Sequence, residues 1–422
     1  MGRLFDRGPA AGALRGRDGS ARAPPQARAR RSASGPLTTP SPSPRPGDAT
    51  AHGPRDAVLV CPTSFKGTIP ADTAARAMAA GLRAAGVGPV DELPLSDGGD
   101  GLLAAVAAVL PGAERMGAEV AGPLGQPISA EYLQHGATAY VESAGTCGLA
   151  LVPPARRDPV RATTRGLGEL IGALRADALV LGLGGSATVD GGAGMAQALG
   201  WRLLNGVGRP IGPGGGGLLS LRRVAPPEPV PAGDGGARIS PPHRVTALAD
   251  VRNRLLGADG AARVFAPQKG ADADDVRRLE EGLERLAERI RSDLGVDIAG
   301  IEGGGAGGGL GAGAVAFLGA SLEGGSAWML DATGFDARLA RARLVITGEG
   351  AYDGQSGMGK IVGAIVDRAG AAGVPVLVIA GRTSAPAREG VRVLTDGGSV
   401  LEAGDLARLA ATGAAAEGRR EA

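Results

Sequence analysis

The hydrophobic positions of this chain fall into short runs, each followed by a polar loop and then by a segment with helical periodicity. Ala57–Cys61 is the first run, and Val90–Leu93 follows after a helical segment with proline in its first turn. Toward the C-terminus the order repeats with Leu344–Thr347, a loop over residues 348–359, a helix and the run Val374–Ala380. This order predicts a parallel sheet, and ligands bind outside the carboxyl ends of such strands.

The middle of the chain has a different pattern. Residues 114–143 alternate in short pieces separated by turns, which predicts antiparallel strands. Ala178–Leu183 reads as a buried strand and Asp272–Leu294 as an amphipathic helix, whereas the Gly- and Pro-rich residues 205–242 predict a long loop.

Together the two patterns predict an α/β protein of two domains. Residues 56–112 and 300–415 form a discontinuous, Rossmann-like parallel-sheet domain in this interpretation, and residues 113–299 form a mixed α/β domain inserted into it. A chain of 422 residues is long enough for two cores, and with aromatic residues at 2% those cores consist of Ala, Val, Leu and Ile.

The first 55 residues have a separate character. They carry ten arginines against three aspartates and hold almost no β-branched or aromatic residues, so we expect them to be disordered and dispensable. A basic interaction tail, a transit-type leader and a start assigned too early are the three interpretations, and we favour the last because the first strand begins at Ala57.

Charge and composition exclude several classes of protein. The net charge of +2 rests on the N-terminal segment, so the folded remainder is mildly acidic and gives no case for binding nucleic acid. Two cysteines give no disulfide framework and fit a reducing cytoplasm, and no apolar run has the length of a membrane span. The three histidines form no ligand cluster or triad, which argues against metal and serine hydrolases. Nothing in the sequence indicates the oligomeric state.

Lysine usage points to phosphate chemistry. Of 45 basic residues only Lys66, Lys269 and Lys360 are lysines, and each lies in a glycine-flanked loop. A compact ammonium fits beside a phosphate oxygen in a crowded site where a broad guanidinium often does not. Chance survival of three surface lysines is the alternative; we favour a site that handles phosphate.

The loop Gly182–Gly192 is the strongest candidate for that site. A buried strand delivers glycines, the hydroxyls of Ser186 and Thr188 and the carboxylate of Asp190 to the start of a helix. Glycines let backbone N–H groups approach phosphate, and the carboxylate could hold magnesium or accept a proton. The alternative is a tight turn in which Asp190 caps the helix.

Three further loops carry candidate groups. Residues 354–360 have the spacing of a Walker A loop, but Ile361 stands where Ser or Thr would hold magnesium, so we interpret the segment as a phosphate site of another family. Asp97 and Asp250 follow predicted strands and are weaker candidates, because Asp-Gly is common turn chemistry. The run Gly303–Gly313 could wrap a ligand, although packing near a helix is the favoured explanation.

Eight motifs, taken in order, resemble the bacterial class I glycerate kinases. They cover nearly all of the chain from Ala57 to about Ala380: SFKGT (64–68), SDGGDG (96–101), VESAGTCGL (141–149), TTRGLGELI (163–171), GLGGSATVDGGAGMAQALG (182–200), FAPQKGA (265–271), GGLGAGAVAFLGA (308–320) and LVITGEGAYDGQSGMGK (344–360). The resemblance implies transfer of the γ-phosphoryl group of ATP to D-glycerate with Mg²⁺, usually giving 2-phosphoglycerate and otherwise 3-phosphoglycerate.

On this interpretation each candidate residue receives a role. The catalytic residues are Lys66, Asp190 and Lys269. Substrate or phosphate binding is assigned to Ser64, Asp97, Gly184, Gly185, Ser186, Thr188, Glu349 and Lys360. The metal ligands are Asp190, Asp250 and Asp353.

The chain departs from the family pattern at three positions. Thr63 stands where the family usually has Asp, Val189 where it has Asn, and Ala351 where it has Arg. These departures motivate an alternative, a catalytically weakened homologue that acts as a glycerate- or nucleotide-binding regulator. Retention of all three lysines argues against that alternative.

We expect Lys66→Arg to be far more damaging than an ordinary exchange of two basic residues. Lys66 lies between Phe65 and Gly67 after a buried strand, where a wider guanidinium would displace the group it serves; a shift of about 1 Å can cost roughly a hundredfold in rate. The check is kcat/KM for both substrates beside a thermal melt, which should be unchanged. Wild-type kinetics would mean that the identity of this cation is unimportant.

Overall fold

The computed structural model describes residues 55–65, 68–228, 242–352, 360–384, 386–388, 390–396 and 401–418. Lys66, Asp353 and the first 54 residues lie outside these ranges, so the predictions made for them stay predictions. Within the described ranges, no helix is long and apolar enough to cross a lipid bilayer.

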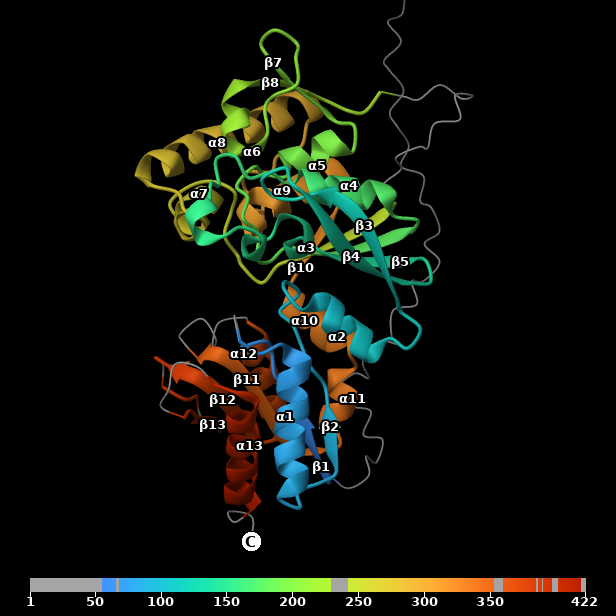
Figure 1. The fold of residues 1–422 in the computed structure, drawn as a ribbon, viewed down its shortest axis with the longest axis vertical. Helices are drawn as coiled ribbons and strands as arrows, with labels where there is room; N and C mark the ends of the chain where they lie inside the picture. The colour runs from blue at the N-terminus through green and yellow to red at the C-terminus, as the bar shows by residue number, and fades with distance from the viewer. Residues whose placement is uncertain are drawn as a thin grey trace, which may run out of the picture. The chain divides into compact units, whose positions relative to one another are not determined.

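The first domain is built on a five-stranded parallel sheet in the order β13-β12-β11-β1-β2 (Figure 1). Its strands are β1 (Ala57–Val60), β2 (Val90–Glu92), β11 (Ala342–Tyr352), β12 (Val376–Thr383) and β13 (Val391–Leu394). Strands from the two ends of the chain therefore share one sheet, as the repeated sequence pattern predicts.

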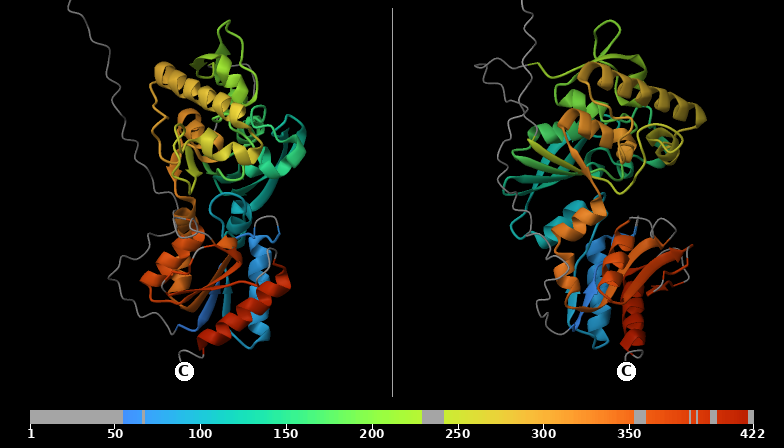
Figure 2. Two further views of the ribbon diagram at one scale, coloured as in Figure 1. Left: turned by 90° about the vertical axis from the view of Figure 1, so that its left-hand side faces the viewer. Right: turned by 180° about the vertical axis from the view of Figure 1, so that it is seen from behind.

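Helices cover both faces of this sheet (Figure 2). One face packs against α1 (Ala71–Ala84) and α13 (Ala403–Gly418), and the other against α11 (Phe335–Leu339) and α12 (Ile361–Ala371). Two more helices, α2 (Leu102–Val109) and α10 (Gly325–Ala332), join a hydrophobic cluster that also contains residues of the second sheet, among them Leu133, Tyr140, Val180 and Leu248.

Strand β1 illustrates why its residues form a central strand. Val58 and Val60 pack on the α1 side, and Leu59 and Cys61 pack on the opposite side, all without exposed surface. An unbroken apolar run is typical of a parallel strand that is covered on both faces.

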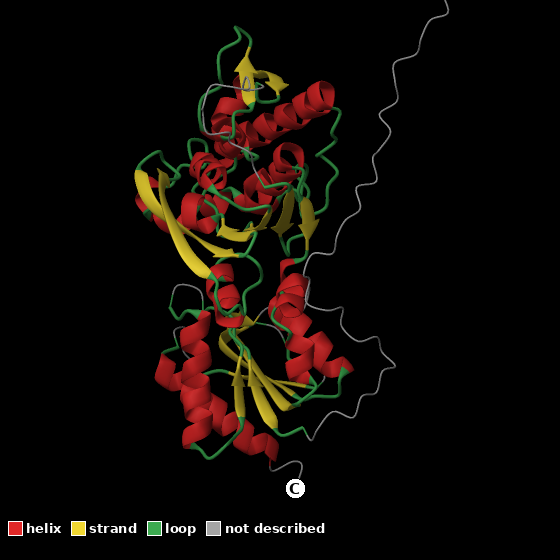
Figure 3. Cartoon of the chain, turned by 90° about the vertical axis from the view of Figure 1, so that its right-hand side faces the viewer, coloured by secondary structure: helices red, strands yellow, loops and turns green. Residues whose placement is uncertain are grey.

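The second domain contains a six-stranded mixed sheet in the order β10-β9-β6-β5-β4-β3. Strands of this domain are drawn in yellow in the upper half of Figure 3. Strands β3, β4 and β5 are antiparallel, whereas β5, β6, β9 and β10 are parallel to one another. Their bounds are β3 (Glu114–Ala121), β4 (Pro127–His135), β5 (Thr138–Glu142), β6 (Ala178–Gly182), β9 (Arg244–Leu248) and β10 (Ser321–Glu323).

Seven described helices and a two-stranded ribbon complete this domain. They are α3 (Ala144–Cys147), α4 (Arg165–Ala173), α5 (Ala193–Ala198), α6 (Gly214–Gly217), α7 (Ala261–Phe265), α8 (Ala273–Leu294), α9 (Ala306–Leu318), β7 (Arg202–Asn205) and β8 (Leu221–Ala225). The carboxylate of Asp272 begins α8 by accepting the backbone N–H groups of Asp274 and Asp275, and Gly295 ends it in a left-handed conformation.

The structure confirms the predicted fold class, a two-domain α/β protein with a parallel sheet and a mixed sheet. The antiparallel pairing within residues 114–143 is also confirmed. The sequence predicts that the chain re-enters the first domain near residue 300, and this boundary stays a prediction. Strand β10 pairs with β9, and α9 packs in the core of the mixed sheet. These contacts favour a boundary at about residue 324.

Two predicted loops are partly wrong. The segment 205–242 contains α6 and β8. Glycines of α6 pack beside α8, and they form hydrogen bonds to the backbone of other segments. One example is the Gly216 N–H, which donates to Val160 O at 2.9 Å. The loop expected after Thr347 begins later, because β11 continues pairing with β12 as far as Tyr352.

Candidate functional site

The loop 96–101, the loop after β6 and the start of α10 meet with their backbones almost in contact. A Cβ atom on Gly98 would lie 2.7 Å from Gly325 Cα, and one on Gly99 would lie 3.0 Å from Gly184 Cα. Only glycine permits this approach, so the glycines that the sequence places in separate motifs bring these motifs to one site.

The loop 96–101 is a tight turn closed by its own side chains. The Ser96 hydroxyl accepts the N–H of Gly98 at 3.2 Å and donates to the Asp100 carbonyl at 3.0 Å. The Asp97 carboxylate accepts the N–H of Gly99 at 3.1 Å. The Asp97 side chain is therefore fixed beside the glycine contact.

Asp250 lies close to Asp97 at the end of β9. Its carboxylate accepts the Ser326 N–H at 2.9 Å and the Ser326 hydroxyl, while burial, with the Asp97 charge adding, raises the pKa of Asp250 to about 6. A cavity of about 500 Å³ opens beside Asp250 and Ser326. The Asp250 carboxylate thus borders an accessible cavity, and the charge of Asp97 is near enough to affect its pKa.

The glycine loop after β6 is held along one side by the segment 143–149. The Ser143 hydroxyl donates to Gly184 O at 3.2 Å, the Leu149 N–H to Gly185 O at 2.7 Å, and the Ala187 N–H to Cys147 O at 2.8 Å. The conformation of residues 184–187 therefore depends on these three hydrogen bonds to the segment 143–149.

Lys269 supports the same loop from the protein interior. Its ammonium group donates to the Ser186 hydroxyl at 3.0 Å and to the Thr188 carbonyl at 2.8 Å, and the residue is 4% exposed. Burial lowers the pKa of Lys269 to about 8, although the nearby Cys147 and Asp190 oppose the shift. The structure thus brings together three of the predicted site residues, Lys269, Ser186 and Thr188.

A glycine run that the sequence analysis interpreted as packing lies directly against this loop. A Cβ atom on Gly308 would lie 1.9 Å from Thr188 O, and the Gly191 N–H donates to Gly308 O at 3.2 Å. Gly307, Gly308 and Gly309 all have positive φ, so the first turn of α9 departs from helical geometry to make room.

Asp190 is the most heavily bonded side chain in the region. Its fully buried carboxylate accepts from the N–H groups of Gly192, Gly194 and Thr164, which lie at 2.9 to 3.2 Å. The hydroxyls of Thr163 and Thr164 donate to it as well, at 3.4 and 3.0 Å. Burial raises the pKa of Asp190 although these donors oppose the shift. This geometry favours the helix-capping interpretation, because the chain's own donors occupy the carboxylate.

The remaining predicted residues lie at the carboxyl edge of the parallel sheet. Thr63 and Ser64 follow β1, where the Thr63 N–H and hydroxyl both donate to Gly348 O, at 2.9 and 3.1 Å. Glu349 is the next residue of β11, and Lys360 immediately precedes α12. These residues belong to one sheet edge, whereas Lys269, Ser186 and Asp190 belong to that of the mixed sheet.

The predicted metal ligands do not form one cluster in the part of the chain that the structure describes. Asp190 and Asp250 belong to separate hydrogen-bond networks, and no group of three Asp, Glu, His or Cys side chains among the described residues could hold a metal ion. Asp353, the third predicted ligand, lies outside those residues.

Glu142 is a residue of the site that the sequence analysis missed. It ends β5, and its carboxylate accepts the Leu103 N–H at 2.7 Å, capping α2 where Gly101 has no side chain to do so. Burial, with the Asp100 charge adding, raises the pKa of Glu142 to about 7. The sequence feature that could have indicated Glu142 is its position, a carboxylate directly after the buried run Ala139–Val141.

The three departures from the family pattern have different surroundings. Val189 is fully buried in the hydrophobic core, so an apolar side chain fits there. Ala351 on β11 is in register with Arg382 on β12, whose exposed side chain is a cation at the neighbouring position. Within the described residues, the Thr63 hydroxyl donates only to backbone carbonyls, those of Gly348 and Ser64.

The two sheets and the lysine-supported glycine loop together define a two-domain α/β protein. Comparison with known proteins identifies the family. The glycerate kinase family model matches residues 58–398. The chain therefore belongs to the glycerate kinase family, and it is an ATP-dependent kinase.

Curated relatives and a solved structure agree with this assignment. The chain is 43% identical over 330 residues to a glycerate kinase of Halalkalibacterium halodurans, covering 77% of this chain and 85% of the relative. It is 40% identical over 335 residues to the glycerate 2-kinase of Escherichia coli K12, covering 77% and 84%. A crystal structure of a Salmonella typhimurium LT2 protein assigned as glycerate kinase 2 superimposes with a TM-score of 0.71 at 37% identity, covering 86% of this chain and 98% of that one.

We expect Asp190→Asn to destabilise the fold strongly. In the variant, an amide NH₂ would replace one carboxylate oxygen and would face backbone N–H groups that need an acceptor. Each buried donor left without an acceptor lowers the free energy of unfolding by about 1–3 kcal/mol. Chemical denaturation gives the free energy of unfolding, with the exposed Asp177→Asn as the matched control. Equal stability of the two variants would refute the assigned role of Asp190 in holding the loop.

Proposed function

We propose that this protein transfers the γ-phosphoryl group of ATP to D-glycerate in a Mg²⁺-dependent reaction that gives 2-phosphoglycerate. Family membership supports the reaction, and the similarity to a relative named glycerate 2-kinase supports the choice of product. The observation that carries the proposal is the buried Lys269 beneath the glycine loop, bonded to Ser186 and Thr188. A buried cation beneath a glycine loop suits a group that carries several negative charges.

Phosphoryl transfer requires positioning and charge neutralisation more than covalent chemistry from the protein. In this proposal the backbone of Gly184 and Gly185 and the hydroxyl of Ser186 bind the transferred phosphoryl group. Lys269 supplies the positive potential and keeps the Ser186 hydroxyl oriented. Asp190 acts by holding the loop, because its carboxylate is already occupied.

The residues present fit a magnesium ion held by two carboxylates. Mg²⁺ in kinases is usually bound by one or two carboxylates together with substrate phosphates and water. Asp97 and Asp250 are close enough for the charge of one to raise the pKa of the other, and both adjoin the glycine loop or α10. When bound, the ion would neutralise phosphate charge; Asp250 and Asp97 would hold it, and Asp353 remains a further proposed ligand.

The edge of the parallel sheet is our proposed site for the rest of the nucleotide phosphates and the substrate carboxylate. Lys360 precedes α12, and free N–H groups at a helix start favour anions. Lys66, Ser64 and Glu349 complete this proposed group. Arg382, beside Ala351 in the sheet, supplies a guanidinium where the family arginine is replaced.

The test is a coupled assay of ADP formation with D-glycerate and Mg²⁺ supplied together and separately. We expect turnover only when both are present. Coupling to enolase alone detects 2-phosphoglycerate, whereas 3-phosphoglycerate requires a mutase as well. Glycerate binding without any turnover would support the regulator and refute the kinase proposal.

We also propose a cytoplasmic location. Cys61 and Cys147 are both buried and unpaired, and burial raises the pKa of each thiol, which keeps it in the unreactive protonated form. Free thiols of this kind are typical of a reducing compartment.

Activity is expected to fall as pH rises through about 8. Burial lowers the pKa of Lys269 to about 8, so its ammonium is charged below that pH and loses its proton above it, which removes the positive potential under the loop. A pH profile of kcat/KM measures the effect. In Lys269→Gln the side chain at this position is neutral at every pH, so we expect low activity that no longer falls above about pH 8. If kcat/KM of the Gln variant still falls above about pH 8, another group is responsible for the titration.

A further inference from the structure

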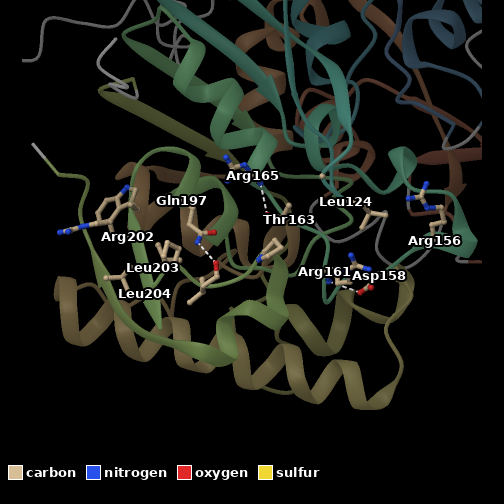
Figure 4. A pocket seen from close by; sticks show the side chains of 15 residues that line it. Leu124, Arg156, Asp158, Arg161, Thr163, Arg165, Gln197, Arg202, Leu203 and Leu204 are labelled. Atoms are coloured by element: carbon tan, nitrogen blue, oxygen red, sulfur yellow. Dashed lines mark hydrogen bonds between the residues drawn. The ribbon is translucent and has the colours of Figure 1, made fainter. Parts of the chain in front are cut away.

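A second cavity, of about 820 Å³, lies wholly within the mixed domain and plays no part in the proposed reaction (Figure 4). Its walls come from α5, β7, the residues around Leu124, the segment 156–165 and residues 210–213. Binding sites for small molecules and cofactors commonly have volumes of about 300–1,000 Å³. The cavity is therefore large enough for a ligand of nucleotide size.

Its lining is strongly positive. Arg156, Arg161, Arg165 and Arg202 contribute to the wall, against the single acidic side chain of Asp158. Arg165 and Arg202 are paired with Glu169 and Glu228, which lie outside the lining.

The other two arginines are available to a ligand. Arg156 and Arg161 are exposed and form no ion pair with any residue that the structure describes. The Asp158 carboxylate instead accepts the Arg161 backbone N–H at 3.1 Å (Figure 4). Two exposed guanidinium groups that line a cavity and have no ion-pair partner among the described residues are suited to bidentate binding of phosphate.

Apolar side chains also line the cavity. Leu124, Trp201, Leu203 and Ile211 contribute to it, and Trp201 is partly exposed while its ring packs edge-on against Phe317 at 5.2 Å. An indole and aliphatic side chains suit a planar, apolar ligand body. A bare inorganic anion would use the arginines but leave this surface uncovered.

The cavity is connected to the glycine loop through the Thr163 side chain. Thr163 lines the cavity, and its hydroxyl donates to Asp190 while accepting the Arg165 N–H at 3.3 Å. Gln197 projects from α5 and donates to Ile211 O at 3.2 Å across the cavity wall. A ligand here would contact the same residues 163–165 and α5 that hold Asp190.

We propose that this cavity is a second binding site, separate from the site of phosphoryl transfer, for a phosphorylated ligand with a planar body, that is, a ligand of the nucleotide class. Arg156 and Arg161 bind its phosphates, and Trp201 and Leu203 contact its base. Occupancy of the cavity is coupled to the glycine loop through Thr163 and Asp190.

The test measures ligand binding by calorimetry on the full chain, with ADP, adenosine and pyrophosphate as probes. The variant is Arg156→Glu/Arg161→Glu, and the control is Arg223→Glu, an exposed arginine of β8 outside the cavity. Because the proposed function already gives ADP one site, wild type and control should bind two equivalents and the double variant one. Adenosine and pyrophosphate should each bind the cavity at least tenfold more weakly than ADP.

Steady-state kinetics then separates this site from the transfer site. We expect the KM for ATP of the double variant to stay within twofold of that of the control. Activation or inhibition of the control by ADP analogues that bind the cavity should be lost in the double variant. An unchanged ADP stoichiometry in the double variant would overturn the proposal. A KM for ATP that rises in parallel with the lost binding would also overturn it, because the cavity would then be the donor's own site. If the protein proved not to be a kinase, wild type would still bind one equivalent of ADP and the double variant none.

Discussion

The buried carboxylate of Asp190 is the interaction on which the candidate site depends. It gathers the N–H groups that begin α5 and the two threonines that begin α4, so one side chain joins two helices and the loop between β6 and α5. A buried charge is tolerated only when it is fully bonded, and this carboxylate meets that condition. The loop is consequently rigid before any ligand arrives, which is what electrostatic stabilisation of a transferred phosphoryl group requires.

Around this carboxylate, the backbone rather than the side chains determines how closely the motifs approach. Gly98 and Gly99 reach Gly184 and Gly325 because none of them has a Cβ atom. Lys269 then fills the remaining interior space with a charge that has only neutral hydrogen-bond partners, Ser186 and Thr188. The depressed pKa of this lysine follows directly from that environment.

Local patterns in the sequence were sufficient for much of the fold. Apolar runs predicted β1, β6 and β9, because a strand that is buried on both faces needs consecutive apolar residues. Asp272 predicted the start of α8, because a capping residue stands directly before its helix. The same reasoning placed Lys269 in a glycine-flanked loop, but it could not reveal that Ser186 and Thr188 are its partners, more than eighty residues away. Glu142 was missed for the same reason: it caps α2 across a distance of 39 residues, which no local pattern reports. The sequence offered both a catalytic and a capping role for Asp190, and the distant donors from residues 163 and 164 are what favour the structural one.

The three glycines that begin α9 have a consequence for how this protein can evolve. Glycine and alanine codons differ at one base, so a single mutation can exchange the two residues. At Gly308 that exchange would drive a methyl group into the Thr188 carbonyl and require a left-handed backbone from alanine. Although it looks like a simple repeat, this run therefore has little tolerance for even the smallest side chain.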